Sequence, residues 1–315
     1  MSSSSSPLFS GLTIHRPPDL DLARRIEALL ASGLPLDSGH MAELVSRNAI
    51  VTGSVLKRAN NAYYGLRHTI GSITHAIDVL EPGRVAHMIL ETAKDVDTTP
   101  LLSELLAHAR MTARVAHRLA VGAWPFEDPR PRAPGMVFTA GLMHNYGRIV
   151  LAQSFLSQAP ALFASSRETV LFDTTDWRTP EQLLFGMDAA EAGEFAASRM
   201  SLPDELVAIM STGGHATSRH PSEMSSLFLI VEVASAFATA AGYDPITSVS
   251  DTDPMTLPAT DTLMESGLAH REDLESVLRT LGLARPTIHS GDRHPVAPVV
   301  ATADASMTAH HSHGH

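Results

Sequence analysis

The chain contains no cysteine among its 315 residues. This absence excludes disulfide bonds, thiolate metal sites and cysteine nucleophiles. Aromatic residues are also scarce, at 5% of the chain, whereas hydrophobic residues as a whole make up 44%. That hydrophobic content is ordinary for a globular protein, and small or straight-chain apolar side chains lose little freedom in a helix. The composition therefore favours a globular protein built from helices.

Basic residues are also few in this chain. Lysine and arginine together number 23 against 34 acidic residues, for a net charge of −11. Binding to nucleic acid in general needs dense basic side chains, so no nucleic-acid partner is expected. No segment offers the roughly 18 uninterrupted apolar residues of a membrane span, so none is expected either. The N-terminal serine run lacks the basic start and apolar stretch of a secretory signal, which predicts a cytoplasmic protein.

The common catalytic loops are missing too. The sequence has no G-x-x-x-x-G-K-S/T loop and no G-x-G-x-x-G between a strand and a helix, which argues against the usual phosphate-binding folds. It also lacks the G-x-S-x-G elbow of serine hydrolases.

Helical spacing of apolar residues fills most of the chain, and no alternating strand pattern persists. Residues 170–172 are the best strand candidate, and residues 124–134 hold four prolines and predict a loop. Gly65 suits a left-handed helix cap. The main predicted helices cover residues 22–30, 41–45, 49–60, 72–80, 83–94, 101–121, 135–154, 181–185, 188–200, 203–211, 226–241 and 272–281.

Two polar pairs are candidates for chemistry. His108 and His144 fall in two long, mostly apolar helices, where their nitrogens either share a metal ion or form a hydrogen-bonded core pair. Asp188 and Glu191 lie three residues apart and form either a catalytic carboxylate pair or, more commonly, a solvated helix face. Gly141, near His144, permits close helix packing or the approach of a ligand.

Five segments, in order between about residues 18 and 242, resemble motifs of HDOD proteins, the HD-related output domains of bacterial signalling. Residues 56–65 (LKRANNAYYG) are similar to L-x-x-A-N-S-A-x-x-G, and residues 70–80 (IGSITHAIDVL) to V-x-S-I-x-x-A-I-x-x-L. Residues 140–151 (AGLMHNYGRIVL) are similar to A-G-L-L-H-D-I-G-K-L-V-L. Residues 186–193 (GMDAAEAG) resemble G-x-D-H-A-E-V-G, and residues 202–209 (LPDELVAI) resemble L-P-x-x-I-x-x-A-I.

The resemblance implies a compact all-α bundle in two helical sub-lobes, residues 15–97 and 98–284. Residues 1–14 and the histidine-rich residues 285–315 are expected to be disordered tails, because polar segments cannot offset the entropy of ordering. The second tail ends in four histidines that are either native or an expression tag, and that can bind metal adventitiously. The motif residues expected to be structural are Asn60, Asn61, Tyr63, Tyr64, Gly65, Gly141 and Gly147.

The departures from the family pattern bear on function. In the catalytic HD phosphohydrolases that HDOD domains resemble, a His, a His-Asp pair and a later Asp hold the metal. His108 and His144 match the histidines, but Asn145 replaces the adjacent Asp and supplies no negative charge to a hard cation. The remaining positions of this vestigial site are Ala189 for a family histidine, Ser235 for the later Asp, and His215 where the family often has two histidines.

What the resemblance implies is therefore a non-enzymatic regulatory protein with no catalytic residue, no cofactor and no metal. Only His108, His144 and His215 remain as candidates for one soft or borderline ion. Its expected partners are signalling proteins acting in trans, and its oligomeric state is open. The alternatives are a metal-dependent phosphohydrolase or phosphodiesterase with an altered ligand set, and a structural unit that binds nothing.

Overall fold

Every element in the described part of the computed structural model is a helix, which confirms the predicted all-α class. The structure describes residues 12, 20–33, 35–92, 99–123, 134–155, 178–212, 225–243, 253–267 and 269–280. All of them belong to one compact unit. Within these ranges no helix is both long and apolar enough to cross a membrane.

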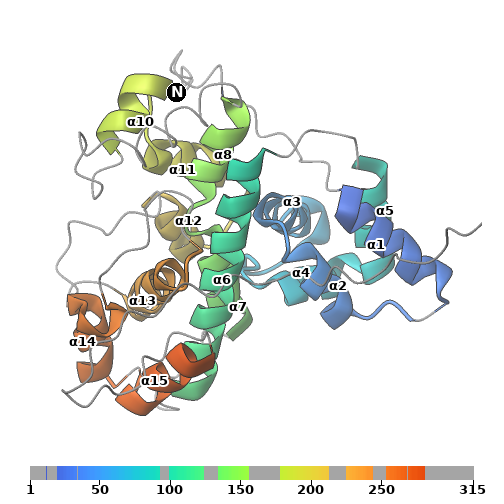
Figure 1. Ribbon diagram of the computed structural model, residues 1–315. Coiled ribbons are helices and arrows are strands. Elements are labelled where there is room, and N and C mark those ends of the chain that lie inside the picture. The colour runs from blue at the N-terminus through green and yellow to red at the C-terminus, as the bar shows by residue number, and fades with distance from the viewer. Residues whose placement is uncertain are drawn as a thin grey trace, which may run out of the picture. The chain divides into compact units, whose positions relative to one another are not determined.

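The helices form two lobes (Figure 1). The N-terminal lobe consists of α1 (Leu20–Ala31), α2 (Ser38–Val45), α3 (Ala49–Ala59), the 3-10 helix η2 (Ala62–Tyr64), α4 (Ile73–Leu80) and α5 (Pro82–Thr92). The C-terminal lobe consists of α6 (Pro100–Ala123), α7 (Pro134–Met143), α8 (Tyr146–Ser154), α10 (Arg178–Phe185), α11 (Ala189–Ala197), α12 (Asp204–Met210), α13 (Ser226–Ala240), η4 (Pro254–Thr256), α14 (Pro258–Glu265) and α15 (Arg271–Thr280). Helices α3 and α4 join the lobes by packing on α6 and α7.

Short polar side chains start the helices of the N-terminal lobe. Asp37 accepts a hydrogen bond from the amide of His40, and Asn48 accepts one from the amide of Ile50, so each satisfies an unpaired amide at a helix start. Asn61 does the same for η2, which ends at Gly65 with a φ of 56°. The predicted left-handed conformation of Gly65 is therefore present.

Asn60 closes the loop that follows α3. Its side-chain amide donates to the carbonyl oxygen of Ile70 at 2.9 Å, and its side-chain oxygen accepts from the amide of Ile70 at 2.7 Å. This two-way bond fixes residues 60 and 70 beside each other and sets the position of α4. The motif asparagine thus has a structural role, as expected.

The long helix α6 is the centre of the C-terminal lobe, and α7 and α13 pack along it (Figure 1). Gly141 lets α7 approach α6 closely, because a Cβ atom at Gly141 would lie 2.7 Å from the Cα of Ala113. Gly147 has the same role between α8 and α11, where a Cβ would overlap the carbonyl oxygen of Ala189. Of the two explanations offered for Gly141, close helix packing is the one that the structure supports.

The prediction of one continuous helix over residues 135–154 is wrong. The chain forms α7 and α8, which are separated by His144 and Asn145. No proline marks this break, and the apolar residues on both sides keep helical spacing.

Helix α14 is an element that the sequence patterns did not indicate. The candidate strand at 170–172 and most of the loop at 124–134 lie outside the described residues, as does the histidine-rich tail. The tail boundaries stay predictions, although Leu12 is described and buried.

Candidate functional site

His108 and His144 meet in the core of the C-terminal lobe. His108 lies in the middle of α6, and His144 follows the last residue of α7, so the break after α7 places its ring against α6. Their Nε2 atoms are 3.2 Å apart, and the exposed fractions of the two residues are 6% and 3%. The structure thus brings together the two histidines that the sequence singled out.

The outer nitrogens of both rings face backbone carbonyl oxygens. His144 Nδ1 is 2.7 Å from the carbonyl oxygen of Gly141, and His108 Nδ1 is 3.0 Å from that of Tyr243. Because a carbonyl oxygen can only accept, each Nδ1 carries the proton and donates it. In the neutral form of each ring, Nε2 is then the acceptor, and two acceptors face each other. The two Nε2 atoms can therefore form a hydrogen bond only when one ring gains a proton or when another group donates a hydrogen bond to them.

Ser235, from α13, provides such a donor. Its hydroxyl oxygen lies 3.2 Å from His108 Nε2 and 3.5 Å from His144 Nε2. A hydroxyl has one proton, so Ser235 can donate to one ring at a time. Thr112, one turn after His108 on α6, places its hydroxyl oxygen 3.5 Å from His108 Nε2. The result is a polar network that links α6, the end of α7 and α13.

Burial keeps His144 neutral. Loss of solvation, and after it the nearby charges of His108 and Arg148, lower the pKa of His144 to about 3, although the hydrogen bond to Gly141 opposes the shift. At neutral pH the Nε2 atom of His144 is therefore an acceptor. A buried neutral imidazole of this kind either accepts a hydrogen bond or binds a metal ion.

Asn145 is buried beside this network, with an exposed fraction of 2%. Its side-chain oxygen has no hydrogen-bond partner among the described residues. Asn145 also precedes α8 without capping it through its side chain. A buried oxygen without a partner is unusual in a native structure, and it leaves the position after His144 as a neutral acceptor.

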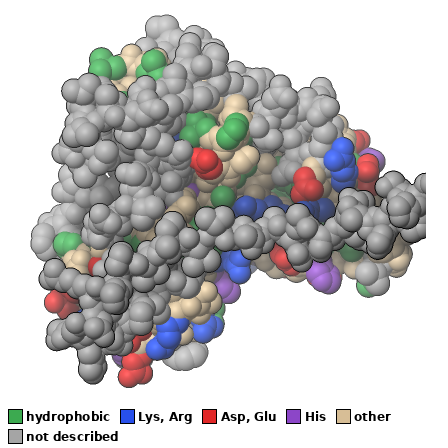
Figure 2. Space-filling view, in the orientation of Figure 1, with side chains coloured by type: hydrophobic (Ala, Val, Ile, Leu, Met, Phe, Trp, Pro, Cys, Tyr) green, Lys and Arg blue, Asp and Glu red, His purple; other side chains and the backbone are tan. Residues whose placement is uncertain are grey.

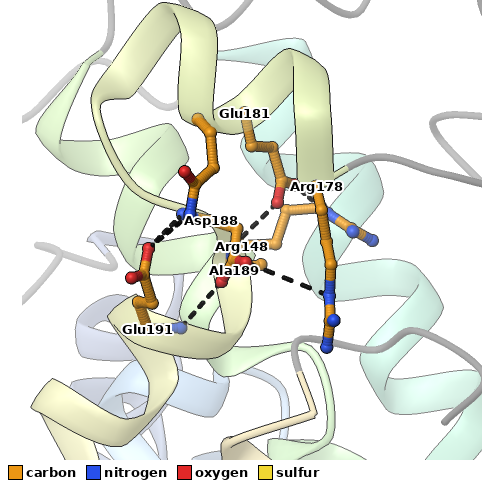
Figure 3. Close-up of polar contacts among 7 residues, drawn as sticks. Arg148, Arg178, Glu181, Asp188, Ala189 and Glu191 are labelled. Atoms are coloured by element: carbon orange, nitrogen blue, oxygen red, sulfur yellow. Dashed lines mark hydrogen bonds and ion pairs between the residues drawn. The ribbon is translucent and has the colours of Figure 1, made fainter. Parts of the chain in front are cut away.

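Ala189 lies in a different set of contacts, at the start of α11 (Figure 3). Its amide donates to Glu181 Oε2 at 2.8 Å, and the other carboxylate oxygen of Glu181 accepts from Arg148 Nε at 2.8 Å. Both charged side chains are buried. The sequence patterns did not indicate this ion pair, because Arg148 and Glu181 are 33 positions apart on different helices.

Asp188 and Glu191 form a capping box at the start of α11 (Figure 3). Asp188 accepts from the amide of Glu191 at 2.9 Å, and Glu191 accepts from the amide of Asp188 at 3.0 Å. This arrangement satisfies two amides at a helix start and explains the spacing of the two acidic residues. The capping box accounts for the two acidic residues without a catalytic role, and Asp188 is buried rather than part of a solvated face.

The metal centre that the likeness to HD phosphohydrolases implies does not fit these residues. In the described ranges, no group of three or more His, Asp or Glu side chains is placed to hold a metal ion. Asn145 and Ser235 stand where that centre needs carboxylates, and Ala189 has no ligand atom in its side chain. His215 lies outside the described residues.

Comparison with known proteins identifies the family and the fold. The HDOD domain matches residues 17–215. Among solved structures, the MmoQ response regulator from Methylococcus capsulatus superposes with a TM-score of 0.64 at 17% identity, covering 87% of this chain and 98% of that one. A virulence factor from Campylobacter jejuni gives 0.61 at 14% identity, covering 88% and 96%. The comparison with curated proteins found no match. Since the HDOD match spans more than half of the sequence, this chain belongs to the HDOD family.

Proposed function

We propose that this protein is a non-enzymatic cytoplasmic regulator that acts by binding partner proteins in trans. The observation that carries the proposal is the contact between Ser235 and His108, with 3.2 Å between the hydroxyl oxygen and Nε2. A hydroxyl that donates a hydrogen bond replaces a ligand oxygen at the point where a metal-dependent hydrolase needs negative charge. The similar fold of a protein described as a response regulator is in keeping with a signalling role.

A hydrolase of the HD type also needs an activated water. A metal ion lowers the pKa of such a water, and a carboxylate commonly bridges or orients the ions. Asn145 and Ser235 are neutral, so they cannot balance the charge of two divalent cations. Glu181, a fully buried acidic residue of this lobe, is already paired with Arg148. These contacts favour regulation over hydrolysis.

One observation favours the alternative of a metal-dependent phosphohydrolase. Two zinc-bound nitrogens at bond lengths of about 2.0–2.1 Å and a tetrahedral angle lie about 3.3 Å apart. The Nε2 atoms of His108 and His144 are 3.2 Å apart, and each Nδ1 donates to a carbonyl, as metal-bound histidines commonly do. The pair can therefore supply two ligands to one borderline ion, but two neutral ligands do not make a hydrolytic centre.

The test compares the full-length wild type with His144→Ala. Both contain the same four C-terminal histidines, so the difference in zinc, manganese and iron content measured by mass spectrometry isolates the core site. We expect no difference, and no hydrolysis of p-nitrophenyl phosphate or cyclic dinucleotides by either protein. A stoichiometric ion that is lost in His144→Ala, together with turnover by the wild type, contradicts the proposal.

A second experiment separates a regulator from a structural unit without partners. Among the described residues, Tyr63 and Leu183 are the most exposed large apolar side chains, at 85% and 78%. Cross-linking and co-purification from the native host should recover a partner with the wild type. We expect Tyr63→Ser or Leu183→Ser to lose it while circular dichroism and the melting temperature stay unchanged. Failure of the wild type to recover any partner reproducibly supports the structural unit instead.

A further inference from the structure

A cleft of about 650 Å³ lies between α6 and α7 on one side and α2 and α4 on the other. Tyr243, whose carbonyl accepts the hydrogen bond of His108, also lines it, so the cleft adjoins the histidine network without including the two histidines. Pockets that bind small molecules commonly measure about 300–1,000 Å³. The cleft therefore has the size of a small-ligand site.

The described lining is rich in arginine, whereas the chain as a whole is acidic. The lining includes Arg47, Arg110 and Arg114, and Glu43 is the one acidic side chain among the described lining residues. The chain as a whole carries −11. Arg110 and Arg114 are four positions apart on α6, and side chains at that spacing share one helix face. Figure 2 shows Lys and Arg side chains gathered in the recess beside α6 and the N-terminal lobe.

Arg47 is incompletely neutralised. Its nearest carboxylate is Glu43, with 3.9 Å between Nη2 and Oε1, at the limit of an ion pair. Its Nε atom is buried and has no hydrogen-bond partner among the described residues. The side chain of Arg47 is 36% exposed, but a buried N–H donor without a partner is unfavourable. An anion in the cleft would give the Nε atom of Arg47 a hydrogen-bond acceptor and would pair with the charge of the guanidinium.

Helix α4 begins at the same cleft, which Ile73 and Thr74 line. Ser72 stands at the N-cap but makes no side-chain capping bond. The amide of Ile73 donates to the hydroxyl of Thr139, whereas those of Thr74 and His75 have no partner within the described ranges. Unpaired amides and the positive end of the helix dipole favour a phosphate at such a position.

The remaining wall is apolar. Met111 and Phe138 are half-buried residues of the cleft, and both pack against the core. The ring of His117 contacts Phe138 edge-on, and burial lowers the pKa of His117, so its imidazole adds little positive charge at neutral pH. A ligand that matches this lining has an anionic end for the arginines and a flat apolar part for Phe138.

We propose that this cleft binds a small phosphorylated molecule of nucleotide size. Its phosphate contacts Arg47, Arg110, Arg114 and the first amides of α4, and its base lies against Met111 and Phe138. Arginine is well suited to this role because its planar donors match phosphate oxygens in pairs. Such a ligand bridges the two lobes, since Arg47 belongs to one and Arg114 to the other.

The test is isothermal titration of the full-length protein with AMP, adenosine and inorganic phosphate at low ionic strength. We expect AMP to bind with one-to-one stoichiometry, and adenosine to bind at least ~10-fold more weakly. Arg114→Gln should weaken AMP binding ~10-fold or more, because one charge-assisted contact is lost. Arg279→Gln, which removes an exposed arginine of α15, is the matched control and should leave binding unchanged.

Thr74→Asp gives a second variant that does not depend on losing an arginine. Thr74 is exposed in the first turn of α4, where a carboxylate favours the helix dipole. We therefore expect an unchanged or higher melting temperature together with AMP binding weakened ~10-fold, because the new charge occupies the phosphate position. The proposal is overturned if neither AMP nor phosphate binds saturably, or if binding is unaffected by both Arg114→Gln and Thr74→Asp.

Discussion

Arg148 Nε donates to Glu181 Oε1 at 2.8 Å inside the C-terminal lobe, where the side chain of Glu181 is fully buried and that of Arg148 nearly so. The second oxygen of Glu181 accepts from the amide of Ala189. One carboxylate thus joins α8, α10 and the start of α11. Because all three groups are removed from water, the loss of any one takes a buried partner from the others.

Glu181→Ala is predicted to lower the free energy of unfolding by about 3–5 kcal/mol, since it removes the carboxylate that pairs with the buried guanidinium of Arg148. Urea denaturation followed by circular dichroism measures this change. Glu194→Ala, at an exposed position of α11, should change stability by less than about 0.5 kcal/mol. The double variant Arg148→Met/Glu181→Leu should recover most of the loss. A double variant no more stable than Glu181→Ala contradicts the assigned role of the pair.

His144→Ala is predicted to destabilise the fold by about 2–4 kcal/mol, because it opens a cavity and removes the hydrogen bond to the carbonyl of Gly141. The same urea titration applies. His75→Ala is the matched control, since His75 is exposed on α4. Equal stabilities of the two variants would show that the histidine network does not stabilise the core.

Stability should fall with acidification as His144 is forced to accept a proton. Burial lowers the pKa of His144 from 6.5 to about 3 in the folded state. Between these pH values the unfolded chain binds one proton more than the folded one, so this contribution is complete above pH 6.5 and is lost as the pH falls towards 3. The slope from one such group is at most about 1.4 kcal/mol per pH unit. His144→Gln should reduce the slope between pH 6 and about 4.5, whereas an identical slope in the variant and the wild type refutes the assignment.

Gly147→Ala is predicted to prevent α8 from packing on α11, because the added Cβ would overlap the carbonyl oxygen of Ala189 and lie 2.6 Å from the amide nitrogen of Gly193. Both obstacles are backbone atoms, so we expect a loss of about 3 kcal/mol or more. Gly83→Ala in the first turn of α5 meets nothing within 4 Å and should be neutral or stabilise by up to ~1 kcal/mol. Melting curves of the two alanine variants provide the comparison, and similar curves would contradict this packing.

Much of the helical pattern could be predicted from the sequence because it is local. Apolar spacing alone indicated α6, α11 and α13, and Gly65 indicated the cap after η2. The break between α7 and α8 could not be predicted this way, since both segments keep helical spacing. The break coincides with long-range contacts on both sides of it: His144 Nε2 lies 3.2 Å from His108 Nε2 on α6, and a Cβ at Gly147 would overlap the carbonyl oxygen of Ala189.

The candidate site, too, could be predicted from the sequence only in part. The likeness to the HDOD motifs indicated that His108, His144 and Ser235 belong together, and the structure places their polar atoms within 3.5 Å of one another. Composition and spacing gave no sign of this proximity, because Ser235 is 91 positions from His144. The ion pair of Arg148 and Glu181 carried no sequence signal, since buried and exposed charges look alike in a sequence.

The glycine contacts on either side of His144 and Asn145 have a practical consequence. Helix α7 packs closely against Ala113 at Gly141, and α8 packs closely against Ala189 at Gly147, so each helix has a backbone contact outside the dipeptide. Carboxylates introduced at residues 145 and 235 would add negative charge between helices that are held by these backbone contacts. The chain is therefore a scaffold in which a metal centre can be designed.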